Sequence, residues 1–245
     1  MPLMRMVAAA VWAAVVVPLA GCGGDGGDGV ESGTGDADQV MISTPTGAPA
    51  ATADAATACA VIVSSGRHLP TSGADLDDHT AYPESLFARV QGAVGLAAAA
   101  TQRDPRFSPV SRAANTLGKD LQHLRVEDFP AAVSATADAC QALGLPVAGP
   151  DPSARGDAAT GCAAAARARD RIEVASFRSF EAADVSHFDG IAMFLRAAAE
   201  ADSRYAALGQ AGQRLGGDVS RFDTRALRAD GSALLAACGA DDLPH

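Results

Sequence analysis

The sequence predicts an all-α protein in which a four-helix unit, linked internally by one disulfide, occurs twice in tandem. Three observations lead to this fold class: an internal repeat, apolar residues at helical spacing in both copies, and four cysteines at matched places in the repeat. The chain of 245 residues is long enough for two small units of this kind. A signal segment and a flexible tether are expected to precede them.

Residues 1–21 have the composition of a secretory signal. A single positive charge, Arg5, precedes an apolar run from Val7 to Leu19. This run is too short for a membrane-spanning helix, which needs ~20 apolar residues. A charged start, a short apolar middle and small residues at the end are typical of a signal peptide that is removed on export.

The signal ends in Leu19-Ala20-Gly21-Cys22, which resembles the lipobox of bacterial lipoproteins. The resemblance implies that the Cys22 thiol carries a fatty acyl chain such as palmitate and that the signal is cut just before it. It therefore implies a protein that is anchored to the cell membrane by lipid and faces the extracytoplasmic side. An ordinary signal peptide with a cysteine nearby is the alternative.

Residues 22–53 are predicted to form a flexible tether after the lipidated cysteine. The stretch from Gly23 to Gly29 contains only Gly and Asp, and the residues up to Ala53 are rich in Thr, Pro, Ala and Asp. Such compositions bury too little apolar surface to fold. A flexible coil of ~31 residues spans roughly 30 Å, so the folded part is expected to stand off the membrane.

The charge of the chain excludes some partners. The formal net charge is −10, and removal of Arg5 with the signal makes the mature protein more acidic still. Nucleic acid is therefore excluded as a partner, and so is electrostatic adhesion to anionic lipid. The expected contact with the membrane is through the lipid anchor.

An internal repeat divides the rest of the chain. The segment 54–60 recurs at 157–163 with six identities in seven positions, and residues 104–146 align without a gap on 202–244 with 14 identities in 43 positions, at an offset of 98. These matches predict a first unit at 54–146 and a second at 157–245. Pro150 and Pro152 break any helix in the linker 147–156 between them.

Both copies carry apolar residues three and four positions apart, which is the spacing of one helix face and not of a strand. The matched sets are Val110, Ala114, Leu117, Leu121 and Leu124 in the first copy, and Leu208, Gly212, Leu215, Val219 and Phe222 in the second. A further matched pair of helices runs through Cys140 and Cys238, and earlier helices are predicted at 54–64, 83–102, 158–174 and 184–201. Four helices per copy with short connections indicate two four-helix bundles.

Four cysteines remain after Cys22 is set aside, an even number for an oxidising compartment. Because each copy must contain its own bridge, the repeat selects Cys59–Cys140 and Cys162–Cys238 among the three formal pairings. Each bridge would link the first helix of a unit to the last and contribute about 4.5 kcal/mol in the chain-entropy model. A metal or redox site is the alternative, but it requires Cys-x-x-Cys or Cys/His clusters, which the sequence lacks.

No motif of catalysis or cofactor binding occurs in the sequence. None of the six Glu residues is followed by His three positions later, as a di-iron bundle requires. Haem-attachment, nucleophile-elbow and phosphate-loop motifs are also missing. No cofactor is therefore predicted, and an enzyme is not favoured.

A polar loop in the first copy is a weak candidate for a metal site. It contains His68, Asp75, Asp77, Asp78 and His79, and it falls where this copy is longer than its sibling. Carboxylate and imidazole ligands together bind divalent cations. The alternative is a solvated acidic loop whose Asp residues cap the next helix, and this alternative is the expectation here.

Two further groups are weak candidates for binding. Arg167, Arg171 and Arg178 lie near one face of a predicted helix and would suit an anionic lipid head or a sugar acid. The alternative is the solvated side of an amphipathic helix. The motif Asp-x-Arg-[Phe/Tyr], at Asp104 and again at Asp202, is either a duplicated binding site or a helix cap with an ion pair and a packing anchor.

The favoured function is a binding or scaffolding module at the cell envelope that engages another envelope protein or an apolar ligand. The duplication favours this function, because two linked modules raise the effective concentration for a repeated partner. An unidentified enzyme and a metal-handling lipoprotein that uses the His68–His79 loop are the alternatives. A wide apolar groove would favour a lipid carrier, and a tightly filled bundle a protein partner.

Overall fold

The computed structural model describes residues 48–77, 84–173 and 180–244. Within these ranges every regular element is a helix and no strand occurs, so the predicted all-α class is confirmed. The predicted signal, Cys22 and most of the tether lie outside the described residues. No helix in the described part of the chain is long and apolar enough to span a membrane.

The first half of the described chain contains four long helices connected by short 3₁₀ turns. The elements are α1 (Ala48–Gly66), η1 (Gly73–Asp77), α2 (Glu84–Arg103), η2 (Pro105–Phe107), α3 (Ser108–Gln122), η3 (Val126–Asp128) and α4 (Phe129–Ala142). Helix α1 begins six residues before its predicted start at Asp54. The added turn is rich in Ala, the strongest helix former, and has Pro49 near its first position, where proline is tolerated.

The second half repeats this succession of helices. Its elements are α5 (Ala154–Arg167), α6 (Arg169–Glu173), α7 (Ala182–Ala201), η4 (Ser203–Tyr205), α8 (Ala206–Ser220) and α9 (Thr224–Ala240). Helix α5 begins after Ser153, whose hydroxyl accepts a hydrogen bond from the Gly156 amide at 3.1 Å. The helix predicted at 158–174 is divided at Ala168 into α5 and α6.

Several helix ends adopt the same left-handed conformation in both halves. The non-glycine residues with positive φ are Leu124, Phe222 and Asp242, and Gly144 has φ +67° at the place that matches Asp242. Beyond each of these residues the chain folds back, as when the Leu145 amide donates to the Cys140 carbonyl at 2.9 Å and the Leu243 amide to the Cys238 carbonyl at 3.1 Å. These bonds satisfy carbonyls that a helix end would otherwise leave without a donor.

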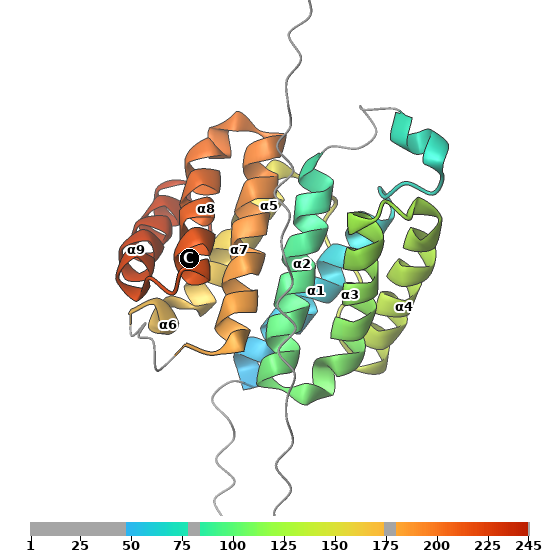
Figure 1. Cartoon of the computed structure of the whole chain (residues 1–245), viewed down its shortest axis with the longest axis horizontal. Helices are drawn as coiled ribbons and strands as arrows, with labels where there is room; N and C mark the ends of the chain where they lie inside the picture. The colour runs from blue at the N-terminus through green and yellow to red at the C-terminus, as the bar shows by residue number, and fades with distance from the viewer. Residues whose placement is uncertain (1–47, 78–83, 174–179, 245) are drawn as a thin grey trace, which may run out of the picture. The chain divides into compact units, whose positions relative to one another are not determined.

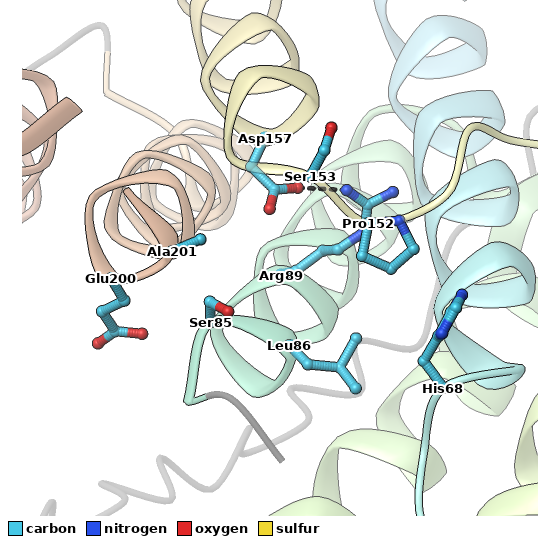
Figure 2. A pocket seen from close by; sticks show the side chains of 9 residues that line it. All are labelled: His68, Ser85, Leu86, Arg89, Pro152, Ser153, Asp157, Glu200 and Ala201. Atoms are coloured by element: carbon cyan, nitrogen blue, oxygen red, sulfur yellow. Dashed lines mark hydrogen bonds and ion pairs between the residues drawn. The ribbon is translucent and has the colours of Figure 1, made fainter. Parts of the chain in front are cut away.

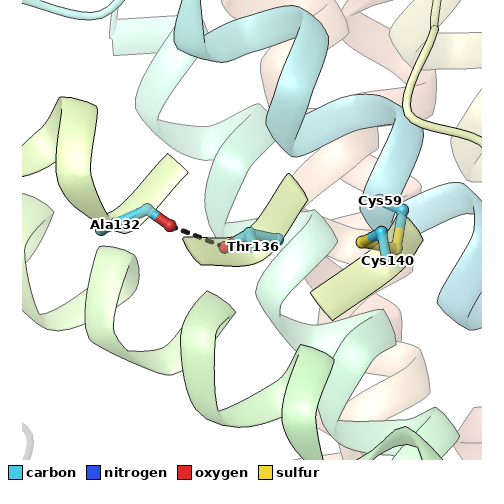
Figure 3. The surroundings of a disulfide bond; sticks show 4 residues. All are labelled: Cys59, Ala132, Thr136 and Cys140. Carbon is cyan, nitrogen blue, oxygen red and sulfur yellow. Dashed lines mark hydrogen bonds between the residues drawn. A yellow bond between two sulfur atoms is a disulfide. The ribbon is translucent and has the colours of Figure 1, made fainter. Parts of the chain in front are cut away.

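Both predicted disulfides are present. Cys59 on α1 is bonded to Cys140 on α4, and Cys162 on α5 to Cys238 on α9, with Cα–Cα distances of 6.0 and 5.7 Å. Figure 3 shows the first bridge between the two helices, near Thr136, whose hydroxyl donates to the Ala132 carbonyl at 2.9 Å. Each bridge therefore links the first helix of its half to the last, as the repeat predicted.

The two halves meet where α2 packs against α7, and these helices lie side by side at the centre of Figure 1. The contact is reciprocal. A Cβ built on Gly92 would lie 2.9 Å from Phe194 and 3.1 Å from the Gly190 carbonyl, while one on Gly190 would lie 3.0 Å from Leu96 and from the Gly92 carbonyl. The offset of 98 relates Gly92 to Gly190 and Leu96 to Phe194. Glycine at both positions thus allows the two backbones to approach closely.

The halves share one hydrophobic core. A single cluster of buried side chains includes Ile62, Leu96 and Phe129 from the first half together with Phe188 and Leu195 from the second. The linker between the halves also packs closely, since a Cβ on Gly149 would lie 2.6 Å from the carbonyl oxygen of Ala60 on α1. The described part of the chain is therefore one packed unit built from two similar halves.

Candidate functional site

Two clefts lie at the junction of the halves. The Arg89 cleft has a volume of about 460 Å³ and is lined by His68, Ser85, Leu86, Arg89, Pro152, Ser153, Asp157, Glu200 and Ala201. The His187 cleft has a volume of about 440 Å³ and is lined by Ala50, Arg103, Arg167, Ala168, Asp170, Arg171, Glu181, Asp184 and His187. Both volumes fall in the usual range for small-molecule sites, ~300–1,000 Å³.

Arg89 on α2 forms the inner wall of the first cleft and is almost fully buried. Its guanidinium donates from Nη1 to the Asp157 carboxylate on α5 and from Nε to the Ser65 hydroxyl at 3.0 Å. Nη2 donates to the Pro150 carbonyl at 3.3 Å and to the Ser64 hydroxyl at 3.4 Å. Figure 2 shows Arg89 and Asp157 facing each other, with His68 apart from this pair. The side chain thus links α2 to α1, the linker and α5.

Burial governs the ionisation of Asp157. Removal from water raises the pKa of this carboxyl to about 6, although the charge and hydrogen bond of Arg89 act in the opposite direction. Asp157 is therefore ionised at neutral pH at a cost in desolvation. It takes up a proton on mild acidification.

Asp54 on α1 lies behind the lining of the second cleft and has no exposed surface. Its carboxylate accepts hydrogen bonds from Arg103 Nη1 at 2.7 Å, Arg167 Nη2 at 3.0 Å and His187 Nδ1 at 2.8 Å. The Nε2 of His187 donates to the Ala164 carbonyl at 3.0 Å. Both ring nitrogens thus face acceptors, so both hydrogen bonds form together only when the imidazole carries two protons.

Asp54 and Asp184 are held in the ionised form. Burial acts to raise the pKa of Asp54, but the hydrogen bond and charge of His187, with the charges of Arg167 and Arg103, hold that pKa below its usual value. For Asp184, burial is likewise outweighed by the hydrogen bond from Arg171, and the pKa is again lowered. Arg171 Nη2 lies 2.6 Å from the Asp184 carboxylate.

The two clefts occupy equivalent places in the repeat. Asp54 and Asp157 are matched in the seven-residue repeat, and the offset of 98 relates Arg89 to His187. In each cleft an aspartate from the first helix of one half accepts a hydrogen bond from the second helix of the other half. The exchange between the two halves is therefore reciprocal.

The lining of the two clefts differs at the other equivalent positions. The His187 cleft has two guanidinium groups and one further carboxylate where the Arg89 cleft has small or neutral side chains. The matched pairs are Arg103 with Ala201 and Asp184 with Leu86 at the offset of 98, and Arg167 with Ser64 at the offset of 103 of the seven-residue repeat. The His187 cleft is therefore the more strongly charged of the two.

Of the three arginines predicted as an anion site, the structure brings Arg167 and Arg171 together in the His187 cleft. Arg178 lies outside the described residues. The other members of this cleft, Asp54, Arg103 and His187, come from helices distant in sequence and were not predicted. The one sequence signal for Asp54 was that an aspartate occurs at the matched position of the second copy, as Asp157.

The residues of the predicted metal loop do not gather in the described part of the chain. His68 lines the Arg89 cleft, and its Nε2 lies 3.6 Å from the Asp151 carboxylate. Asp75 accepts hydrogen bonds from the Thr71 and Ser72 amides, both at 3.0 Å, and Asp77 ends the short helix η1. Asp78 and His79 lie outside the described residues. Among the described residues, no three metal-ligating side chains come together.

The shared Asp-x-Arg motif has a structural role in both halves. Asp104 accepts from the Arg106 amide at 3.1 Å and Asp202 from the Arg204 amide at 2.9 Å, so each caps a short 3₁₀ helix. Each aspartate is also ion-paired with its arginine, at 2.8 and 2.7 Å respectively. Phe107, which follows Arg106, is buried in a small cluster. The cap, ion pair and packing anchor account for the motif.

No family model, curated protein or solved structure matches this chain. The functional argument therefore depends on the chain's own residues.

Proposed function

We propose that this chain is an exported, lipid-anchored binding protein that takes a small polar ligand in the clefts between its two halves. The observation that carries the binding function is the pair of equivalent clefts, each with a charged side chain buried at its inner wall. Buried charge is costly unless it is paired or used. Convergent polar groups in a cleft of this size are typical of ligand sites.

The sequence supports the location that this function requires. Leu19-Ala20-Gly21-Cys22 resembles a lipobox, and the segment before it has the composition of an export signal. Two disulfides suit an oxidising compartment outside the cytoplasm. A lipid on Cys22 would hold the clefts near the membrane surface, within reach of ligands that enter the envelope.

The anchor is tested by metabolic labelling with a fatty acid in a bacterium that expresses the full chain. The wild type is expected to take up the label and to remain with the membrane fraction. The Cys22→Ala variant is expected to lose the label, because the acceptor thiol is gone. Label retained on that variant would show that Cys22 is not the attachment site.

Binding is tested by native mass spectrometry of the protein purified from membranes in mild detergent. A small molecule that leaves on denaturation is expected, and a tryptophan at the rim of the cleft that holds it should displace it. The two rim variants are Ala201→Trp for the Arg89 cleft and Ala50→Trp for the His187 cleft. Ala131→Trp, at an exposed position of α4, is the matched control.

If no small molecule is retained, or if it survives both rim variants, the clefts are not its site and the proposal is wrong. A protein partner retained in place of a small molecule would favour the scaffolding alternative.

A further inference from the structure

We infer that the His187 cleft binds an oxyanion, a phosphate or carboxylate group of a small ligand, through Arg167 and Arg171. The inference rests on the proposed binding function and names the chemistry of one of its two sites. The source of the oxyanion is either a phosphate on a lipid headgroup or a free small acid. Both present the same oxygen atoms to the cleft.

The guanidinium groups of this cleft are held in place by carboxylates behind them. Arg167 donates to Asp54 from Nε and Nη2, at 3.2 and 3.0 Å. Its Nη1 makes no hydrogen bond within the described part of the chain, and the side chain is 24 % exposed. A planar guanidinium fixed from one side presents its remaining donors to the other side. This geometry suits recognition of a phosphate or carboxylate.

The inner wall of the cleft has more positive than negative groups. Arg103, Arg167 and Arg171 face two buried carboxylates, those of Asp54 and Asp184. Asp170 and Glu181 at the rim offset this excess, so an anion would bind by taking the place of Glu181 beside Arg171.

Two carboxylates at the rim, those of Asp170 and Glu181, would repel an anion. Glu181 lies beside Arg171, where the anion would bind. Asp170 is exposed to solvent, and Glu181 lies 3.7 Å from Arg171 with its side chain 69 % exposed. An exposed ion pair of that length contributes little. Glu181 is therefore a weak competitor of a ligand oxyanion for Arg171, and its carboxylate keeps the hydrogen bond from the Asp184 amide in the capping box of α7.

The equivalent Arg89 cleft provides a comparison within the same molecule. Its lining includes a single arginine, Arg89, where the His187 cleft is lined by Arg103, Arg167 and Arg171. Its one buried guanidinium, on Arg89, is already engaged by a carboxylate, two hydroxyls and a carbonyl. Oxyanion binding is therefore expected in the His187 cleft alone.

The test is isothermal titration calorimetry of the purified protein at neutral pH and constant ionic strength. The probes are inorganic phosphate, glycerol 3-phosphate as a headgroup mimic, and glucuronate, with chloride as the reference ion. Glycerol 3-phosphate binding more tightly than phosphate would point to a lipid source, and glucuronate binding best would point to a free acid. Circular dichroism melting checks that each variant is folded.

Three variants define the site. Arg171→Gln removes one guanidinium and is expected to weaken binding roughly ten-fold, the usual value of a hydrogen bond to a charged group. Glu181→Gln removes the competing charge and is expected to strengthen binding roughly two-fold. Arg204→Gln, which breaks an exposed ion pair away from the cleft, is the matched control and should leave binding unchanged.

The inference is overturned if no probe binds better than chloride, if Arg171→Gln binds as the wild type does, or if Glu181→Gln weakens binding. An equal loss in Arg204→Gln would show non-specific attraction and would also overturn it. If native mass spectrometry retains a neutral ligand while every oxyanion fails, the inference falls and the proposed function stands. If both experiments fail, both are wrong.

Discussion

Asp54 on α1 and His187 on α7 lie 133 positions apart in the chain, yet their side chains form a 2.8 Å hydrogen bond between the two halves. The equivalent pair, Asp157 on α5 and Arg89 on α2, makes the reciprocal contact. Each half therefore contributes one aspartate and one side chain that hydrogen-bonds to the aspartate of its sibling. The two contacts differ in their electrostatics, because the pKa of Asp54 is lowered and that of Asp157 is raised.

This difference predicts unequal effects of matched substitutions. Asp54→Asn removes the carboxylate that Arg103, Arg167 and His187 share. It is expected to lower the free energy of unfolding at pH 7 by about 3 kcal/mol or more, since it leaves buried cations without their partner. Asp157→Asn also leaves a buried cation, Arg89, but is expected to cost less, because the desolvation that raises the pKa of Asp157 offsets part of what its charge contributes. Urea denaturation of both variants measures the difference, and equal losses would contradict it.

Asp157 also predicts a pH dependence of stability. Its pKa is about 6 in the folded protein against 3.8 when unperturbed, so the folded state binds the proton more tightly than the unfolded state does. The resulting stabilisation is complete below pH 3.8 and is lost as the pH rises through about 6. Between these limits the free energy of unfolding of the wild type should therefore fall by about 3 kcal/mol relative to that of Asp157→Asn.

Urea denaturation at a series of pH values tests this dependence as the difference between wild type and Asp157→Asn, which cancels the other titrating groups. A difference that does not change with pH would show that Asp157 keeps its ordinary pKa. Asp54 and Asp184 act in the opposite sense. Their lowered pKa values add stability that is present above pH 3.8 and lost on further acidification.

The α2–α7 junction predicts opposite effects of alanine at two helical glycines. Gly92→Ala places a Cβ 2.9 Å from Phe194 and 3.1 Å from the Gly190 carbonyl, and is expected to destabilise the protein by about 1–3 kcal/mol through overpacking. Gly118→Ala is the matched control on α3, where the nearest atom, on Val94, is 3.5 Å away. That change is expected to stabilise by about 1 kcal/mol through helix propensity. Thermal melts compare the two, and a stabilising Gly92→Ala would contradict the close approach.

The shared core predicts cooperative unfolding of both halves. Removal of either disulfide, as Cys59→Ser/Cys140→Ser or Cys162→Ser/Cys238→Ser, is expected to cost a similar amount, because the bridges close loops of 81 and 76 residues. The chain-entropy model gives about 4.5 kcal/mol for each. Calorimetry should show one transition in the wild type and in both variants. Two separate transitions would mean that the halves are independently stable.

The helices and the disulfide pairing followed from the sequence because their signals are local or repeated. The spacing of apolar residues such as Val110 and Leu117 indicates one buried helix face, regardless of which helix packs against it. The Cys59–Cys140 pairing could be predicted because Cys162 and Cys238 lie at the matched positions of the second copy. The caps at Asp104 and Asp202 depend only on neighbouring amides.

The clefts did not follow from the sequence, because they form between segments that only packing brings together. Arg167 and Arg171 were noticed as neighbours on one helix, but nothing in their spacing indicates Asp54 or Asp184 as partners. The sequence showed that an aspartate occurs at this position in both copies, but it did not indicate what Asp54 does. Its role depends on Arg103, Arg167 and His187, which α2, α5 and α7 bring to its carboxylate.

The sequence by itself determined an all-α chain of two similar halves, each with its own disulfide, behind a signal-like segment. Only the tertiary structure decided that the halves share one core through Gly92 and Gly190, and that Asp54 and Asp157 each pair with the opposite half. Helix periodicity records which face of a helix is buried. It does not record which helix covers that face, and the partner of a buried charge is set by that second choice.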